Sequence, residues 1–518
     1  MFVRRIPNKT GTVSVQVISK HTGKYKMMRS FGTGRNEQEL VRLEEHARQF
    51  ISEQQGFAGE LFPDEDDVRL EDFLSTIHNT QIQVVGPELV FGRLYDRIGY
   101  CQIKNDLFRH LVICRLFSPG SKLKTIDYLE RYQGIIYSKD RIYRFLDTLC
   151  KNDNKLDADI KERVEQITFG HTKRVLHGKI TVAFYDMTTL YFESSDEDDL
   201  RKTGFSKDGK HQCPQIFLGL LTANGGNPIG YEIFEGNIFE GHTFIPVLQN
   251  IEKKYSLGKP IVVADAGLLS EENRKSLENS GYKYILGARI KSLAENLKEK
   301  ILSFHLQDDQ TKTIKQEDGA RLIVSMNDKR AKKDKKNREK GLKRLQKRIQ
   351  TGKLTRSNIN NRGYNKYLKL EGKITISINE EKFFADAAWD GIKGYVTNTR
   401  LTAKKVMEHY ANLWYIERAF RMNKTDLRIR PIYHYLRNRI EGHICICFTA
   451  YTILLEVERM LKHEKSEITV TRAQELTKTM YQLTYRLPKA RLTKTKILRM
   501  DNQQQELYDM TVRWSKRK

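Results

Sequence analysis

Long apolar runs and paired cysteines are both missing from this sequence. No apolar run of 18 residues occurs among the 518, so we expect no membrane-spanning helix. The first residues, Met1-Phe-Val-Arg-Arg-Ile-Pro7, lack the apolar stretch of a secretory signal. The six cysteines include no Cys-x2-Cys pair, which favours free thiols in a reducing cytoplasm. No Gly-x4-Gly-Lys-Ser/Thr motif is present, which disfavours a nucleotide-driven motor.

Acidic residues are few relative to basic ones. The chain has 91 Lys and Arg against 65 Asp and Glu, a net charge of +26. An excess of this size indicates a polyanionic partner. Because the basic residues occur along the whole chain, nucleic acid is the first candidate. An anionic membrane surface is the alternative, but no amphipathic anchor supports it.

Two aspartates stand in apolar segments that are typical of β-strands. Asp186 lies within Thr181–Phe192, and Asp265 ends the run Pro260–Asp265. Each has an ordinary explanation, because an Asp at the end of a strand often caps the next helix. A carboxylate buried in such a segment is costly unless it is paired or binds a metal ion.

A third acid, Glu417, lies on a stretch that should be helical from Tyr410 to Lys424, downstream of the plausible N-cap Thr402. At about 3.6 residues per turn, one face of this helix carries an acid and a lysine inside an apolar stripe. That face comprises Tyr410, Leu413, Glu417, Phe420 and Lys424. An amphipathic helix with one misplaced Glu is the simpler explanation of this stretch taken alone.

Taken together, these segments resemble the insertion-sequence transposases of the DDE class. One subgroup has a Tyr-x2-Arg-x3-Glu-x6-Lys signature, and Tyr410, Glu417 and Lys424 match its spacing, while Leu413 stands where the arginine is expected. The resemblance includes the flanking residues Thr188 and Gly267, the pair Gly236-Asn237 and the segment Arg430-Pro-Ile-Tyr-His434. It is strongest to the IS-sixteen-thirty-four branch of the IS-four-type superfamily.

The resemblance implies a DNA transposase that binds the terminal inverted repeats of its own insertion sequence. It implies metal-dependent cleavage and strand transfer, with Asp186, Asp265 and Glu417 as catalytic residues that hold two Mg²⁺ ions, for which Mn²⁺ can substitute. Tyr410, Arg418, Arg421 and Lys424 are then expected to contact DNA. The partners are double-stranded DNA at the element's ends and at the target, and a second copy in a homodimer. We expect a prokaryotic-type, nucleoid-associated protein and no membrane partner.

An α/β fold with an RNase H-like core follows from the same resemblance. The expected order is three antiparallel strands, helix, strand, helix, strand, which forms a mixed five-stranded sheet. We expect a β-hairpin and helices that bind DNA ends at 1–150, core segments at 151–289 and 387–462, an insertion domain at 290–386, and a basic tail at 463–518.

The insertion contains a strongly basic run. Residues 329–348 include twelve Lys or Arg and two acids. They have too few apolar residues for a core stripe, so we expect a solvated helix. Such runs are usually plain surface, but here contact with DNA phosphates is equally plausible, through Lys332, Lys333, Lys335 and Lys336. Two rival functions remain: an RNase H-like nuclease or resolvase without transposition, and a catalytically inactive DNA-binding derivative.

Overall fold

The chain divides into two compact units, residues 1–81 and 82–518, in a computed structural model. The structure describes all residues except 9–10, 22–23, 60–64, 151–158, 205–211, 256, 269, 353, 356–357, 361–362, 372–374, 488–491 and 518. The sequence groups residues 1–150 as one region, whereas the structure assigns 82–150 to the second unit. Among the described residues, no helix is long and apolar enough to cross a membrane.

The first unit is an antiparallel sheet covered by a helix. Its strands are β1 (Phe2–Pro7), β2 (Val13–His21) and β3 (Lys24–Gly34), followed by α1 (Glu37–Gly59) and α2 (Glu65–Ser75). Val15 and Val17 of β2 are buried against Leu40 and Ala47 of α1. The expected β-hairpin is present as β2 and β3, and residues 22–23 between them lie outside the described residues.

An eight-stranded mixed sheet forms the centre of the second unit. Its strands are β5 (Val182–Tyr191), β6 (Gln215–Ala223), β7 (Pro228–Glu235), β8 (Ile261–Ala264), β9 (Tyr284–Ala288), β10 (Thr311–Lys315), β11 (Arg321–Met326) and β14 (Ile392–Thr397). The spatial order is β10-β11-β14-β9-β8-β5-β6-β7. β5, β6 and β7 are antiparallel neighbours, whereas β8 is parallel to β5 and β9 is parallel to β8.

The prediction of five strands is wrong. The five expected strands are present in the expected order, but β14, β11 and β10 extend the sheet beyond β9. The error has a physical cause, because β10 and β11 lie in the segment that reads as a separate insertion. The pairing of β11 with β14 joins residues some 70 positions apart, such as Ile323 and Tyr395, and no local pattern indicates it; β10 then pairs with β11.

Helices cover both faces of the sheet, so its central strands are apolar throughout. Alternate residues of β5 are buried in two different cores. Ala183, Tyr185 and Met187 lie in one core, and Phe184 and Leu190 lie in the other. Two helices connect the strands, α8 (Phe244–Tyr255) and α9 (Glu271–Asn279). α7 (Ile160–Val175) precedes β5.

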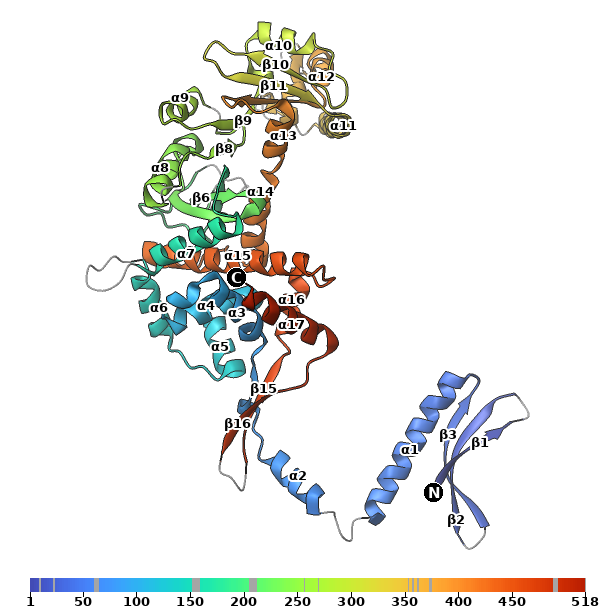
Figure 1. The fold of residues 1–518 in the computed structure, drawn as a ribbon. Helices are drawn as coiled ribbons and strands as arrows, with labels where there is room; N and C mark the ends of the chain where they lie inside the picture. The colour runs from blue at the N-terminus through green and yellow to red at the C-terminus, as the bar shows by residue number, and fades with distance from the viewer. Residues whose placement is uncertain are drawn as a thin grey trace. The chain divides into compact units, whose positions relative to one another are not determined.

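The long helix α15 (Arg437–His463) lies between the sheet and a helical layer (Figure 1). That layer comprises α3 (Arg93–Ile98), α4 (Asp106–Phe117), α5 (Lys122–Gln133) and α6 (Lys139–Thr148). Ile440, Ile444 and Phe448 are buried at the helical spacing that the sequence predicts. On the sheet side, the Tyr451 hydroxyl donates to the Gly226 carbonyl over 2.8 Å, at the turn between β6 and β7.

The segment beyond β11 folds around the basic run. That run forms α11 (Asp328–Gln350), followed by the hairpin of β12 (Leu368–Glu371) and β13 (Thr375–Ile378) and by α12 (Glu380–Ala387); α10 (Glu295–Leu302) precedes β10. The helix is not solvated on all sides as expected, because Gly341 and Leu345 are buried. Leu345 packs with Tyr367 and Phe383.

The C-terminal residues that read as a basic tail fold onto the second unit. They form α16 (Val470–Thr477), β15 (Tyr481–Arg486), β16 (Thr493–Ile497) and α17 (Asn502–Lys516). β15 pairs with β4 (Ile82–Val84), and Trp514 of α17 is buried in the main core.

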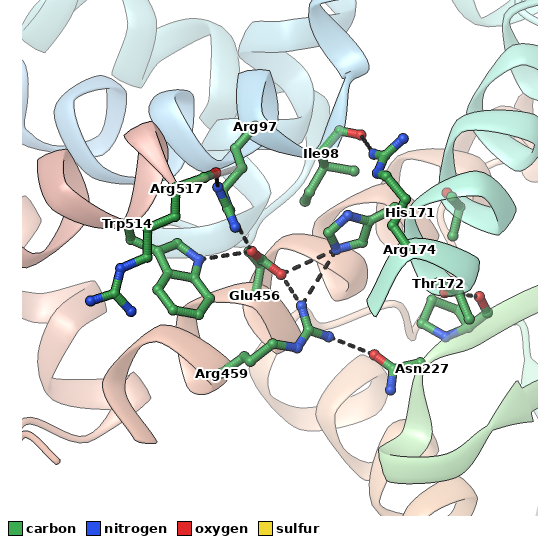
Figure 2. Close-up of polar contacts among 12 residues, drawn as sticks. Arg97, Ile98, His171, Thr172, Arg174, Asn227, Glu456, Arg459, Trp514 and Arg517 are labelled. Atoms are coloured by element: carbon green, nitrogen blue, oxygen red, sulfur yellow. Dashed lines mark hydrogen bonds and ion pairs between the residues drawn. The ribbon is translucent and has the colours of Figure 1, made fainter. Parts of the chain in front are cut away.

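Glu456 of α15 joins four parts of this unit in a buried polar network (Figure 2). Its carboxylate accepts hydrogen bonds from Arg97 of α3 (3.0 Å), His171 of α7 (3.1 Å) and Trp514 of α17 (2.8 Å). Arg459 pairs with the same carboxylate and donates to Asn227 beside β7 over 2.6 Å. Burial opposes ionisation, but the His171 hydrogen bond and the Arg459 charge lower the pKa of Glu456 to about 2.

Glu456→Gln should lower the free energy of unfolding by about 3–5 kcal/mol, because it removes a buried carboxylate and leaves the half-buried Arg97 and Arg459 without their counter-charge. Urea unfolding at neutral pH measures the loss. The matched control is Glu458→Gln on the same helix, which removes a partly exposed pair with Arg418 and should cost less than about 1 kcal/mol.

The difference in the free energy of unfolding between the parent and Glu456→Gln should disappear at acidic pH. The folded-state pKa lies below the usual value of 4.5, so the carboxylate stabilises the fold fully above about pH 4.5, and that contribution is lost as the pH falls towards 2. A gap that stays constant across this range would contradict the assignment of the stabilisation to Glu456.

Candidate active site

The parallel pairing of β5 with β8 sets two carboxylates side by side. Tyr185 stands opposite Ala264 in this register, so the next residue of each strand is an aspartate, Asp186 and Asp265. Neighbouring strands are about 4.8 Å apart. By the alternation of side chains, both aspartates face the same side of the sheet as Phe184 and Val263, which belong to the core that includes α15.

Backbone amides fix both aspartates. The Asp265 carboxylate accepts from the Gly267 N–H over 2.7 Å, and that of Asp186 accepts from the Met187 N–H over 2.8 Å. A Cβ at position 267 would lie 2.8 Å from Oδ1 of Asp265, so the glycine permits this turn. Asp265 does not cap the following helix, because Ser270 is the N-cap of α9.

Glu417 reaches the same side of the sheet from α14 (Trp414–Arg421), which contacts β5. The sequence predicts one helix over this region, and that prediction is wrong. α13 (Ala403–Ala411), capped by Thr402 as expected, ends at Ala411, with Asn412 as its C-cap. The amides of Leu413 and Tyr415 then bond carbonyls three residues back, at 3.1 and 3.0 Å, which is a tighter turn than an α-helix has.

Asparagine is a weak helix former, and it occupies this break. A π-helical turn, Met422–Asp426, follows α14 and rotates Lys424 away from the position that a regular helix would give it. The alignment of Tyr410, Glu417 and Lys424 on one ideal helix face is therefore not what brings groups together here.

One cavity of about 300 Å³ includes all three acids. Asp186, Asp265 and Glu417 line it together with Tyr410, Lys393, Leu413 and Trp414. Leu413 is 8% exposed, which confirms that the residue at the signature's arginine position continues the apolar stripe. The structure thus brings together the three acids and Tyr410.

The other predicted DNA contacts lie outside this cavity. Arg418 forms an ion pair with Glu458 of α15 at 2.5 Å. Arg421 is exposed at the end of α14, and Lys424 is half-buried in the π-helical turn. The lysines of the basic run, Lys332, Lys333, Lys335 and Lys336, are exposed on α11.

Lys393 of β14 is the residue that sequence reasoning missed. The sequence indicates a strand only from Gly394, whereas β14 begins two positions earlier at Ile392, and nothing local marks Lys393 as part of a site. The amine of Lys393 lies 4.3 Å from the centre of the Tyr410 ring. Burial, and then the charge of Arg330, lower the pKa of Lys393 to about 8, although Glu417 acts in the opposite direction.

Tyr410 is held tightly against the sheet. Its hydroxyl would lie 2.4 Å from a Cβ at position 287, so only glycine allows this approach. Burial, and then the Asp265 carboxylate, raise the pKa of the Tyr410 phenol. The hydroxyl therefore stays protonated and can donate a hydrogen bond inside the cavity.

The donor set fits hard divalent cations, because Mg²⁺ takes oxygen ligands and retains waters. Among the described residues, no group of three His, Cys, Asp or Glu is arranged around one point. Two ions that share one carboxylate do not require such an arrangement, because each then needs only two of the three acids.

The model of the family described as "Transposase DDE domain" matches residues 177–453, more than half of the chain and all three acids. The chain belongs to this family. No curated protein matches the sequence.

Solved transposase structures resemble the fold at low identity. A piggyBac transposase synaptic complex with hairpin DNA is 10% identical, with a TM-score of 0.37 over 78% of this chain and 80% of that one. A Mos1 transposase paired-end complex with the left transposon end is 12% identical, with a TM-score of 0.16 over 34% of this chain and 56% of that one.

Two neighbouring charges act in opposite directions on the pKa of Lys393, so removing each one should shift it in the opposite direction. Arg330→Gln should raise the pKa of Lys393 above about 8, and Glu417→Gln should lower it, because the first removes a repelling charge and the second an attracting one. NMR titration of labelled lysine side chains measures both shifts, with Lys393→Arg to assign the signal. Glu408→Gln, on the exposed side of α13, is the control and should change nothing. If the pKa of Lys393 is unchanged in Glu417→Gln, Lys393 does not interact with the acids of the cavity.

Proposed function

We propose that this protein is a DNA transposase of an insertion sequence, which binds its terminal inverted repeats and catalyses Mg²⁺-dependent cleavage and strand transfer. The observation that carries the proposal is the shared cavity of Asp186, Asp265 and Glu417, from β5, β8 and α14, within a DDE-family domain. The order and directions of β5 to β9 support an RNase H-like core. The signature around Tyr410 and Glu417 supports the IS-four-type superfamily and its IS-sixteen-thirty-four branch.

The three acids have distinct roles in this proposal. Asp186 would hold both ions, while Asp265 and Glu417 would each hold one. When bound, two Mg²⁺ ions activate the attacking oxygen and stabilise the leaving one. The protein's own contribution would be to hold the two aspartates by backbone amides and to offer the scissile phosphate two donors, the Tyr410 hydroxyl and the Lys393 amine.

The remaining parts of the chain have proposed roles in DNA binding. The region 1–150 would recognise the element's ends, and Arg421 and Lys424 would contact the cleaved strand. We propose a division into core segments 151–289 and 387–462, an insertion at 290–386 of which β10 and β11 join the main sheet, and a C-terminal part at 463–518. Acting on two ends implies at least a homodimer. The rival nuclease would cleave without joining strands, so joined products on a target plasmid decide between the two.

Asp186→Asn, Asp265→Asn and Glu417→Gln should each reduce strand cleavage by roughly a thousandfold or more. Metal ions supply several kcal/mol of transition-state stabilisation, and each 1.36 kcal/mol is a factor of ten in rate. Nicking of a plasmid that carries the element's ends, with and without MgCl₂, measures the loss, while gel shifts show that binding survives. Glu193→Gln, an exposed acid after β5, is the control. Normal cleavage by any one of the three variants would remove that residue from the site.

Replacing Lys332, Lys333, Lys335 and Lys336 with Gln should flatten the salt dependence of DNA binding. Each phosphate contact that is lost lowers the slope of log affinity against log salt by roughly 0.9. Affinity measured over a series of KCl concentrations gives the slope, and site preference should stay as in the parent because phosphates carry no base identity. An unchanged slope would mean that α11 is merely solvated.

A further inference from the structure

A second cavity, of about 580 Å³, lies in the helical layer and shares no lining residue with the carboxylate cavity. Its walls come from the turn between α4 and α5, from α6, from the loop that follows α14, and from α15. This loop, which lies between the π-helical turn and α15, contributes Arg428, Arg430, Pro431, Tyr433 and His434. Four of these five residues belong to the segment that the sequence singled out and the proposed function leaves unused. Five described lining residues are Arg or Lys, and none is Asp or Glu: Arg115, Lys122, Lys124, Arg428 and Arg430.

Two of these cations are buried, and neither has an ion-pair partner among the described residues. Arg115 is 4% exposed and Lys122 is 5% exposed. The Arg115 guanidinium donates one long hydrogen bond, 3.5 Å, to the Leu427 carbonyl. In the part of the chain that the structure describes, the Lys122 amine has no hydrogen-bond or ion-pair partner. Burying an unpaired charge costs several kcal/mol, so such an arrangement is expected where an anion completes the site.

Asp147 is the acid whose charge acts on this cavity, through His434, and it is already paired with an arginine. Asp147 acts on His434, but its carboxylate accepts two hydrogen bonds from Arg439, at 2.6 and 2.8 Å. Burial, followed by the charge of Lys122, lowers the pKa of His434 to about 3, so this ring stays neutral. The positive charge of the cavity therefore comes from its lysines and arginines alone.

The backbone favours an anion at the same place. α5 begins at Lys122, and the Ser121 side chain caps it by accepting from the Lys124 N–H. The start of this twelve-residue helix lines the cavity, where its partial positive charge adds to the side chains. Burial, and then Arg115, lower the pKa of Lys122 to about 7, so a bound anion would restore a full charge on this amine at neutral pH.

We propose that this cavity binds a phosphate group, held by Lys122 and Arg115 and by the start of α5. The group is either a backbone phosphate of a DNA strand or a free phosphate anion. A DNA phosphate gains access past the exposed rim, where Tyr433 is 63% exposed and Lys124 is also exposed. The site goes beyond the proposed catalysis and can exist without it.

Thermal melts of the full chain test the site with inorganic phosphate as the probe. The parent's Tm should rise with phosphate and not with chloride at equal ionic strength, because a ligand that binds only the folded state stabilises it. Lys122→Met should melt no lower than the parent without phosphate, since it replaces a buried unpaired charge, and should lose the phosphate response. Lys104→Met, an exposed lysine of the same unit, should retain it.

A rim variant keeps the test decisive if Lys122→Met fails to fold. Lys124→Gln changes an exposed residue and should weaken the phosphate response several-fold without abolishing it. DNA binding then identifies the source of the phosphate. Loss of one backbone contact in Lys122→Met should reduce the salt slope by roughly 0.9, in the manner of a single neutralised phosphate.

If Lys122→Met loses the phosphate-dependent rise in Tm and also has a lower salt slope for DNA binding, the site binds a DNA phosphate. If only the rise in Tm is lost, the site binds a free phosphate anion. If the parent shows no phosphate-dependent rise and Lys122→Met has the parent's slope, the proposal is overturned. A variant in the carboxylate cavity tests the phosphate site separately from the catalytic proposal. Asp186→Asn should keep the phosphate response, so failure of the catalytic proposal and failure of this one give different results.

Discussion

The parallel pairing of β5 with β8 is the constraint on which the candidate site depends. Both strands are buried on two faces, so their register is fixed by packing, and a shift of one residue would turn every side chain to the opposite face. The two aspartates stand just where the pairing ends, next to apolar residues that cannot move into water. An apolar sheet thus holds two carboxylates close together, which like charges alone would resist.

The third carboxylate depends on a different part of the fold. Glu417 is presented by a short helix whose buried side, Ile416, Ala419 and Phe420, belongs to the same core as α15. That long helix is in turn tied by Glu456 to α3, α7, α17 and the β6–β7 turn (Figure 2). A buried ion network is a weak source of net stability, but it does penalise any shift of α15 that breaks its hydrogen bonds. We infer that its value here is to fix position.

The choice of the three acids rests on the family resemblance, because each acid taken alone has an ordinary explanation. Local patterns in the sequence suffice for the five central strands and the helices between them, because these follow from alternation and helical spacing. They do not suffice where distant segments pair. The place of β10 and β11 in the main sheet depends on contacts with β14, and the position of Lys393 depends on the same pairing. Local patterns also do not predict the helix break at Asn412, because weak helix formers are common inside helices and packing decides which of them ends a helix.

The positive charge of this chain acts in two physically different environments. The lysines of α11 are exposed, so their attraction for any polyanion reaches about a Debye length, near 8 Å at physiological salt, and weakens as salt is added. Arg115 and Lys122 are enclosed, so salt screens them little, but they act only on a group that enters their cavity. Exposed charge favours encounter and enclosed charge favours position. The proposed transposase would need both kinds of charge, the exposed kind to attract a DNA strand and the enclosed kind to hold one of its phosphates in place.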